Sequence, residues 1–231
     1  MSGSAKRFQC VAFDAVGTLI YAEPSVGAAY AQYGQRFGSR LTAEQIKTRF
    51  AEAFRRADAS STARFGEPGR TNEAHELEFW RQVVDEVLPD VADRSACFAE
   101  LFEHFGRSDS WRCFDDVAAT LQELERRGYR VLIASNFDAR LNRVCDGLVE
   151  LRAVERRVIS SLVGYRKTHR GFYDSVVAAA ECDRSEVLMV GDDLVNDVES
   201  ARAAGLTAVH LRRDGDDSEL RRLTDLLEML P

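Results

Sequence analysis

The chain has 231 residues, which is about one and a half domains at roughly 150 residues per domain. Hydrophobic residues make up 45% of it and charged residues 30%, which excludes a disordered or fibrous chain and predicts a globular protein with one large and one smaller core. Since 31 Lys and Arg stand against 38 Asp and Glu, the net charge is −7, and we expect no nucleic-acid partner.

Cysteine usage and the apolar stretches bear on the compartment. The five cysteines are scattered singly with no Cys-x-x-Cys pair, which predicts free thiols in a reducing compartment. The first apolar run ends at Asp14, too early for the apolar segment of a signal peptide. The longest apolar stretches, such as 176–180, fall far short of the roughly 18 residues that span a membrane. We therefore expect a soluble cytoplasmic protein without a membrane partner.

Apolar, β-rich runs alternate with segments of helical periodicity. Between the runs, apolar residues recur at helical spacing, as at Val117, Leu121 and Leu124, and again over 172–180. Strands that alternate with helices predict an α/β fold with a parallel sheet. The predicted strands are 8–13, 130–134, 157–162, 187–190 and 207–211.

One stretch breaks the alternation. Residues 25–105 show no convincing strand but several apolar stripes at helical spacing, which predicts a helical insertion. Its Ser, Gly and Pro content predicts a loop over 60–70 between two helix pairs. Thr42 and Gln45 form a possible capping box, Asp138 can cap a later helix, and the acidic run 214–219 predicts a turn before a last helix.

Polar residues follow the first two predicted strands. Asp14 and then Gly17 come directly after the first strand, at the edge where open α/β sheets bind ligands. Asp14 is therefore a candidate nucleophile or metal ligand, although a turn aspartate would look the same. Ser135 and Asn136 end the second strand and lead into a helix, which suits an anion site or a plain helix cap.

Two further motifs follow the third and fourth strands. Lys167 is one of only three lysines, which favours a positioned charge, although most lysines simply lie on the surface. Asp192, Asp193 and Asp197 crowd the end of the strand over 187–190. Their mutual repulsion would be unfavourable without a cation or a basic group.

These motifs follow successive strands in the order Asp, Ser, Lys and Asp-rich, and in this the chain resembles the haloacid dehalogenase superfamily. That superfamily has a strand-terminal Asp with Gly-Thr-Leu, a Ser or Thr, a Lys, and a Gly-Asp with further acids. The match covers nearly the whole chain, and Gly-Asp-x-x-x-Asn-Asp followed by Ala-Arg-Ala-Ala-Gly is a specific pattern. The resemblance implies a Rossmann-like parallel-sheet core of residues 1–20 and 108–231, with an inserted all-helical cap over 21–107.

The resemblance also implies a role for each matched residue. Asp14 would be the covalent nucleophile, forming an aspartyl intermediate that water cleaves. Ser135, the backbone of Asn136 and Lys167 would bind the phosphoryl oxygens and the charge that develops there. Mg²⁺ would be the cofactor. Its ligands would be the Asp14 carboxylate, the Val16 carbonyl and Asp192, with Asp197 and Asp193 acting through water.

One position departs from the pattern of the phosphatases that the chain resembles. They carry a second aspartate as general acid and base two residues after the nucleophile, where this chain has Val16. General acid-base catalysis contributes roughly 10² to 10⁴ to a rate, so ordinary alkyl phosphates should react poorly. The proline that commonly follows the motif lysine is also replaced, by Thr168.

Three functions stay open. The first is Mg²⁺-dependent hydrolysis of a small phosphorylated metabolite with a good leaving group, or with a cap residue such as His75 as the acid. The second is hydrolysis of a C–Cl or C–P bond, since dehalogenases and phosphonoacetaldehyde hydrolases also lack the second aspartate. Dehalogenases need no Mg²⁺, and the C–P enzymes need a cap lysine, for which Lys47 is the one candidate. The third is a noncatalytic binding module.

The sequence also leads to expectations about the substrate, the oligomeric state and the residues of the cap. We expect a small-molecule substrate, and a monomer or weak homodimer. Since Lys47 lies between polar neighbours, we expect it to be exposed. The cap residues that could contact a substrate by type and position are Arg64, Arg70, His75 and Trp80.

Overall fold

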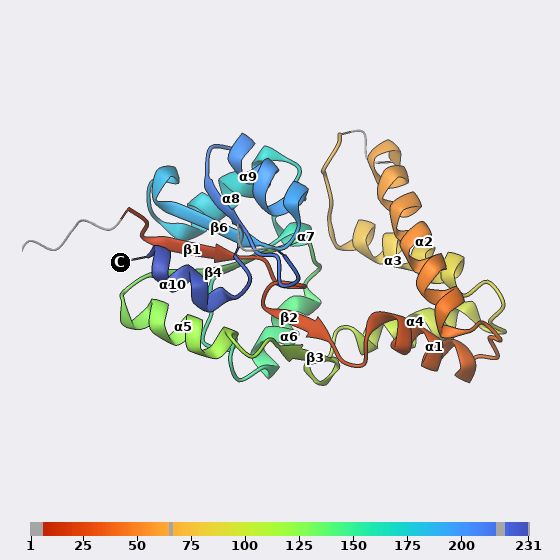
Figure 1. Cartoon of the computed structure of the whole chain (residues 1–231). Helices are drawn as coiled ribbons and strands as arrows, with labels where there is room; N and C mark the ends of the chain where they lie inside the picture. The colour runs from red at the N-terminus through yellow and green to blue at the C-terminus, as the bar shows by residue number, and fades with distance from the viewer. Residues whose placement is uncertain (1–6, 65–66, 216–219, 231) are drawn as a thin grey trace, which may run out of the picture.

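The computed structural model describes residues 7–64, 67–215 and 220–230. Its centre is a five-stranded sheet of order β5-β4-β1-β6-β7 in which neighbouring strands run parallel. All five predicted strands are present, so the α/β fold class is confirmed (Figure 1). The strands are β1 (Cys10–Phe13), β4 (Arg130–Ser135), β5 (Arg157–Ile159), β6 (Val187–Gly191) and β7 (Thr207–His210).

The sheet is buried on both faces, which is why its strands are continuous apolar runs. Val11 and Phe13 pack into one hydrophobic cluster, whereas Cys10 and Ala12 pack into another. Helices that carry apolar stripes complete each cluster, giving three layers (Figure 1). On the first face these are α5 (Val117–Arg126), α6 (Arg140–Gly147) and α10 (Leu226–Met229), and on the second α8 (Arg170–Ala180) and α9 (Ser200–Ala203).

The helical insertion has its own core. Four helices stand beside the sheet (Figure 1) and pack on a separate cluster that includes Tyr30, Phe79 and Phe98. The predicted capping box is confirmed, since the Thr42 amide donates to Gln45 Oε1 at 2.8 Å and the Gln45 amide donates to Thr42 Oγ1 at 3.3 Å. The helices are α1 (Val26–Arg36), α2 (Ala43–Arg64), α3 (Glu73–Val87) and α4 (Arg94–His104).

A two-stranded antiparallel ribbon joins the insertion to the core. The chain leaves through β2 (Ile20–Ala22) and returns through β3 (Trp111–Cys113), which pair directly (Figure 1). The sequence did not predict these strands, because three residues are too few for a clear alternation of apolar and polar positions.

Two predicted boundaries were wrong. The strand predicted over 157–162 ends at Ile159, and a short helix, α7 (Ser160–Val163), follows because the Ser160 hydroxyl donates to the Phe137 carbonyl oxygen at 3.0 Å. The loop predicted from residue 60 begins later, since α2 continues to Arg64. The apolar pattern resumes at Leu162 after two serines, which conceals the first boundary, and no proline marks the second.

The other local predictions concern a cap at Asp138, the acidic run near the C-terminus and the last helix. Asp138 lies one residue before the cap position of α6, and its carboxylate accepts the Arg140 amide at 3.1 Å. Part of the predicted acidic turn, 216–219, lies outside the described residues, and the predicted last helix is α10. Within the described ranges, none of the helices is long and apolar enough to cross a membrane.

Candidate active site

Three strand ends meet at one edge of the sheet. Asp14 follows β1, Ser135 is the last residue of β4, and Asp192 follows β6. Strand β1 lies between β4 and β6, so these residues are neighbours. The chain turns to opposite sides of β1 here, and such switch points are where open α/β sheets bind ligands.

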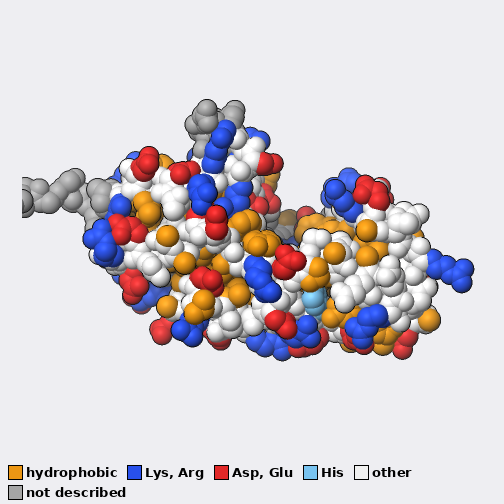
Figure 2. Space-filling view, turned by 60° about the horizontal axis from the view of Figure 1, so that its bottom comes forward, with side chains coloured by type: hydrophobic (Ala, Val, Ile, Leu, Met, Phe, Trp, Pro, Cys, Tyr) orange, Lys and Arg blue, Asp and Glu red, His pale blue; other side chains and the backbone are white. Residues whose placement is uncertain are grey.

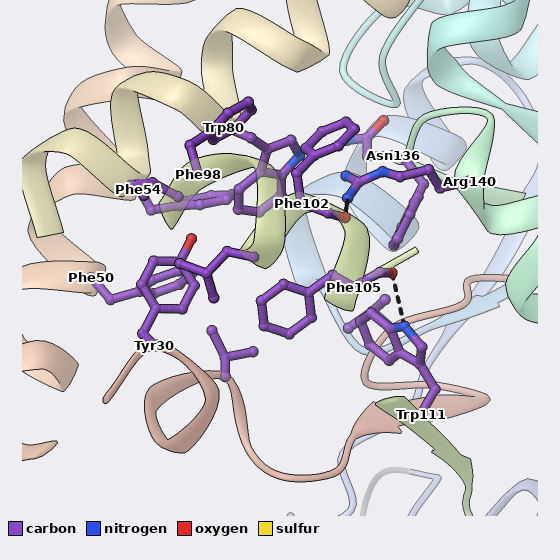
Figure 3. A pocket seen from close by; sticks show the side chains of 15 residues that line it. Tyr30, Phe50, Phe54, Trp80, Phe98, Phe102, Phe105, Trp111, Asn136 and Arg140 are labelled. Carbon is purple, nitrogen blue, oxygen red and sulfur yellow. Dashed lines mark hydrogen bonds between the residues drawn. The ribbon is translucent and has the colours of Figure 1, made fainter. Parts of the chain in front are cut away.

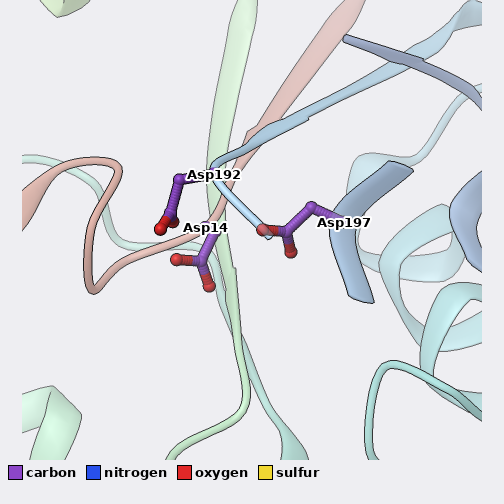
Figure 4. A group of neighbouring side chains, drawn as sticks. All are labelled: Asp14, Asp192 and Asp197. Atoms are coloured by element: carbon purple, nitrogen blue, oxygen red, sulfur yellow. The ribbon is translucent and has the colours of Figure 1, made fainter. Parts of the chain in front are cut away.

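Three carboxylates gather at this edge. Ligand oxygens of Asp14, Asp192 and Asp197 all lie within 4.8 Å of one another (Figure 4). Asp197 comes from the π-helical turn η3 (Leu194–Glu199), which re-aims it toward the strand ends. Two of the three acids predicted to crowd the end of this strand, Asp192 and Asp197, therefore lie together with Asp14.

Two glycines make room for this cluster. Gly17 has φ of +92°, and a Cβ there would lie 2.3 Å from Asp192 Oδ2. A Cβ on Gly191 would lie 2.1 Å from Asp197 Oδ2. Only glycine allows both approaches, because each distance is far inside van der Waals contact.

Lys167 lies between two of the acids. Its side chain is 2% exposed, and its ammonium donates to Asp14 Oδ1 and, at 2.6 Å, to Asp197 Oδ1. The Ser135 hydroxyl lies 3.4 Å from the same oxygen of Asp14. The Asn136 side chain accepts the Lys167 amide at 2.9 Å, which fixes the lysine loop against β4. The structure thus brings the Asp, Ser, Asn and Lys of the sequence motifs together.

Burial and charge crowding shift the pKa values here. Burial, opposed by Lys167 and reinforced by the carboxylates of Asp197 and Asp192, raises the pKa of Asp14 to about 7. Loss of solvent around Asp192 raises the pKa of that group too. Burial lowers the pKa of Lys167, but Asp14 and Asp197 outweigh burial and raise it above the ordinary value. Lys167 is therefore a fixed cation.

The donor set fits a hard cation such as Mg²⁺. Three acids face one lysine, carboxylate oxygens are the ligands that Mg²⁺ prefers, and the two glycines leave space beside them. Both Asp197 oxygens already accept hydrogen bonds, Oδ1 from Lys167 and Oδ2 from the Asp193 amide at 3.0 Å. Asp197 therefore orients the lysine, and Asp14 with Asp192 form the cation-facing pair.

Other residues support the pair. Thr18 is buried, and its hydroxyl donates to Asp192 Oδ1 at 2.9 Å. The sequence contained Thr18 within the first motif, but nothing indicated this contact with a residue 174 positions away. Asp193 accepts the amides of Val195 and Asn196, each at 2.9 Å, so it caps the turn.

An aromatic cavity of about 300 Å³ lies between the helical insertion and this edge of the sheet (Figure 3). Val16 and Asn136 line it from the core side, and Trp80 lines it from α3. Hydrophobic side chains also lie on the side of the insertion that faces the core (Figure 2). Sequence periodicity missed most of the wall, because aromatic residues at helical spacing predict a packed core equally well.

Most of the other insertion residues nominated from the sequence lie elsewhere. Arg70 stacks over Tyr165, with its guanidinium carbon 4.5 Å from the ring centroid. His75 lies in the first turn of α3, with Asn72 Nδ2 3.4 Å from its Nε2. Lys47 is exposed on α2, as expected. The side chain of Arg64 lies outside the described residues.

Known proteins resemble the chain over most of its length. Residues 8–205 match the haloacid dehalogenase-like hydrolase family. Haloacid dehalogenase-like hydrolase domain-containing protein 3 of Danio rerio is 26% identical over 218 residues, covering 91% of this chain and 88% of that protein. The Homo sapiens protein of the same name is 24% identical over 205 residues, covering 87% and 80%.

Solved structures share the fold. An L-2-haloacid dehalogenase superposes with a TM-score of 0.74 at 17% identity, covering 96% of this chain and 98% of that one. A phosphatase of the superfamily from Thermococcus onnurineus gives 0.64 at 19% identity, covering 96% and 97%. The two differ in the bond they break, so likeness at this level establishes architecture alone. With the family match over residues 8–205, the chain belongs to the haloacid dehalogenase-like hydrolases.

Proposed function

We propose that the protein is a Mg²⁺-dependent hydrolase of small phosphate esters or acyl phosphates that have good leaving groups, with Asp14 as nucleophile. The observation that carries this proposal is the placement of Asp14 at the end of β1, in contact with Lys167 and beside Asp192. A buried carboxylate held between a fixed cation and a second acid suits attack on a phosphorus atom that a cation also holds.

The chain's own residues divide the work. A carboxylate oxygen of Asp14 forms a bond to phosphorus as the bond to the leaving group breaks, and water then cleaves the aspartyl phosphate, releasing phosphate and restoring Asp14. Lys167, the Ser135 hydroxyl and the backbone N–H of Asn136 bind the phosphoryl oxygens where negative charge grows. Asp197 holds Lys167 in place.

Asp14, the Val16 carbonyl and Asp192 would hold Mg²⁺, with Asp197 reaching it through water. Bound there, the ion would supply charge neutralisation between nucleophile and phosphate. In support, a Bacillus subtilis hydrolase of the superfamily was solved bound to magnesium, and it superposes with a TM-score of 0.73 at 15% identity, covering 97% of this chain and 99% of that one.

Val16 limits the substrate range. A valine cannot donate a proton to the leaving group, and the loss of general acid catalysis raises the barrier by roughly 3 to 5 kcal/mol. His75 is not among the residues that line the cavity beside Val16, so it is a poor substitute acid. The substrate must therefore carry a group that departs without protonation.

Carbon–halogen hydrolysis is the second candidate. The missing acid and the apolar cavity favour it, and L-2-haloacid dehalogenases are among the solved structures that share the fold. The three-carboxylate cluster argues against it, because a dehalogenase has no need of a cation site. A C–P hydrolase is less favoured still, since Lys47 is exposed and absent from the cavity wall.

Activity with matched substrates separates these functions. We expect the wild type to hydrolyse acetyl phosphate and p-nitrophenyl phosphate with Mg²⁺ and to lose that activity with EDTA. Asp14→Asn should abolish it, whereas Asp115→Asn, at an exposed surface aspartate, should not. Release of chloride from 2-chloropropionate without Mg²⁺ would instead establish a dehalogenase. If neither wild type nor Val16→Asp binds Mg²⁺ or hydrolyses a broad phosphate panel, the protein is a noncatalytic module.

A further inference from the structure

The cavity beside the nucleophile loop is almost entirely aromatic and aliphatic. Its wall on the side of the helical insertion is built of rings (Figure 3). Val16, which is 39% exposed, lines it from the core side. A volume of about 300 Å³ is about twice that of an engineered apolar cavity of about 150 Å³ that binds benzene, which is room for two fused rings. Its ring-bearing lining residues include Tyr30, Phe50, Phe54, Trp80, Phe98 and Phe105.

Two polar side chains of the wall, Arg140 and Trp111, are already engaged in hydrogen bonds. The Arg140 guanidinium donates to both Asp138 oxygens at 2.7 Å and to the Phe102 carbonyl oxygen, and it lies 3.3 Å from the Phe102 ring centroid. Trp111 Nε1 donates to the Phe105 carbonyl oxygen at 3.0 Å. A sugar or nucleoside placed here would exchange water for an apolar wall, which penalises each buried hydroxyl. The cavity therefore selects apolar groups.

Leaving-group chemistry points the same way through a separate observation. Where the phosphatases that the chain resembles have a proton donor, this chain has Val16, which lines the cavity and carries no acidic group. A phenol ionises with a pKa of about 10, as tyrosine does, and so departs as phenolate without help. An alkyl alcohol is far less acidic and needs the missing acid.

We propose that the natural substrates are aryl phosphate monoesters, whose ring occupies this cavity while the phosphoryl group lies at Asp14. The inference rests on the proposed phosphohydrolase function and names its substrate class. An Asp14 oxygen bonds to phosphorus as the P–O(aryl) bond breaks, the electron pair leaves with the phenolate, and the phenolate takes a proton from solvent. Water then cleaves the aspartyl phosphate, giving inorganic phosphate and free Asp14.

The test compares substrates of similar leaving-group acidity but different size. With Mg²⁺, we expect kcat/KM for 2-naphthyl phosphate to exceed that for phenyl phosphate at least tenfold, and glycerol phosphate to be hydrolysed far more slowly than either. Phe54→Ala, in the cavity wall, should reduce the naphthyl-to-phenyl ratio at least fivefold. Leu77→Ala is the matched control, since Leu77 is 39% exposed against 38% for Phe54 and lies outside the cavity.

The outcomes distinguish the proposed substrate class from the proposed phosphohydrolase function. Hydrolysis of acetyl phosphate with equal kcat/KM for the two aryl esters overturns the substrate class and leaves the phosphohydrolase function standing. A naphthyl-to-phenyl ratio that Phe54→Ala leaves unchanged, in a variant whose circular dichroism matches the wild type, overturns the cavity as the ring site. No hydrolysis of any phosphate by the wild type overturns the proposed function itself.

Discussion

Val16 and Asp14 lie two positions apart on one loop. Asp14 can act as a nucleophile, whereas Val16 cannot protonate a leaving group. Asp14 contacts Lys167 and is buried, whereas Val16 lines the aromatic cavity. Nucleophilic attack and leaving-group departure are separate demands, so a chain can keep the first group and lack the second. The reaction is then restricted by the substrate's own leaving group.

Restoring an acid at this position should broaden the substrate range. Val16→Asp adds a proton donor two residues after the nucleophile, so we expect hydrolysis of glycerol phosphate to rise by about tenfold or more, within the roughly 10² to 10⁴ that such groups contribute. Val16→Asn is the control, because an asparagine side chain has nearly the same shape as an aspartate but carries no acidic proton. Equal rates for the two variants would show that proton donation does not limit the reaction.

The raised pKa of Asp14 predicts a pH dependence of metal binding. Mg²⁺ binds the ionised carboxylate, and in the metal-free protein the pKa of Asp14 is about 7, so binding must release a proton below that pH. We expect the apparent affinity to fall about tenfold per pH unit below pH 7 and to level off above it. Calorimetry in buffers of different ionisation enthalpy measures the proton released, and a flat affinity from pH 5.5 to 8 would contradict the assignment.

The raised pKa of Asp14 also determines whether stability rises or falls with pH. The folded pKa of about 7 lies above the ordinary 3.8, so the folded metal-free protein holds a proton that the unfolded chain has lost. The contribution of Asp14 to the free energy of unfolding is therefore complete below about pH 4 and disappears as the pH rises through 7. Bound Mg²⁺ should offset that loss, because it favours the ionised form.

At the scale of elements, helix α3 ties the insertion to the loop that carries Lys167. Glu76 is 4% exposed, and its carboxylate accepts Arg166 Nε at 3.1 Å, Arg166 Nη2 at 3.0 Å and the Thr71 hydroxyl at 2.6 Å. Arg166 precedes the lysine, so this bidentate pair positions the site loop from the insertion side. Glu73 adds a contact to the Ala139 amide at 2.9 Å.

Two substitutions around the same arginine measure this tie. Glu76→Gln removes the buried charge opposite Arg166, and we expect the free energy of unfolding in urea to fall by about 2 to 3 kcal/mol. Asp58 also pairs with Arg166, but the Asp58 side chain is 60% exposed. We therefore expect Asp58→Asn to lower the free energy of unfolding by less than about 1 kcal/mol. Similar losses in the two variants would show that the buried pair is not the main tie.

The sequence predicted those elements whose pattern is long or fully buried. Each of the five sheet strands is an apolar run because helices cover both faces, and so each could be found. Strands β2 and β3 could not be found, since three residues carry too little periodicity. The helix that begins at Ser160 was missed because apolar residues resume at Leu162, whereas a local hydrogen bond from Ser160 ends the strand at Ile159.

The sequence predicted which residues form the candidate site better than it predicted how their side chains contact one another. Parallel topology alone brings Asp14, Ser135 and Asp192 to one edge, so their meeting follows from strand order. The contact between Thr18 and Asp192 depends on side-chain rotamers across 174 positions, which no motif encodes. The cavity was missed because a stripe of rings looks the same whether it packs against protein or faces an empty space.

At the scale of the whole molecule, the site lies where two independently packed cores meet. A ligand that contacts both should stabilise their closed arrangement, in proportion to its concentration over its dissociation constant. Beryllium fluoride with Mg²⁺ mimics a phosphorylated aspartate, so we expect it to raise the melting temperature of the wild type but not that of Asp14→Asn. Stabilisation by chloride or a haloacid, with no effect of beryllium fluoride, would favour the dehalogenase.

The ribbon of β2 and β3 has a consequence for how the chain can change. Ala22 and Trp111 face one another across it, so the insertion departs and returns at neighbouring points. The closure entropy of an inserted segment grows only slowly with its length once its ends are held together. The ribbon therefore lets the inserted segment change in length without moving the strands of the core sheet, provided that the contact between Glu76 and Arg166 beside Lys167 is kept.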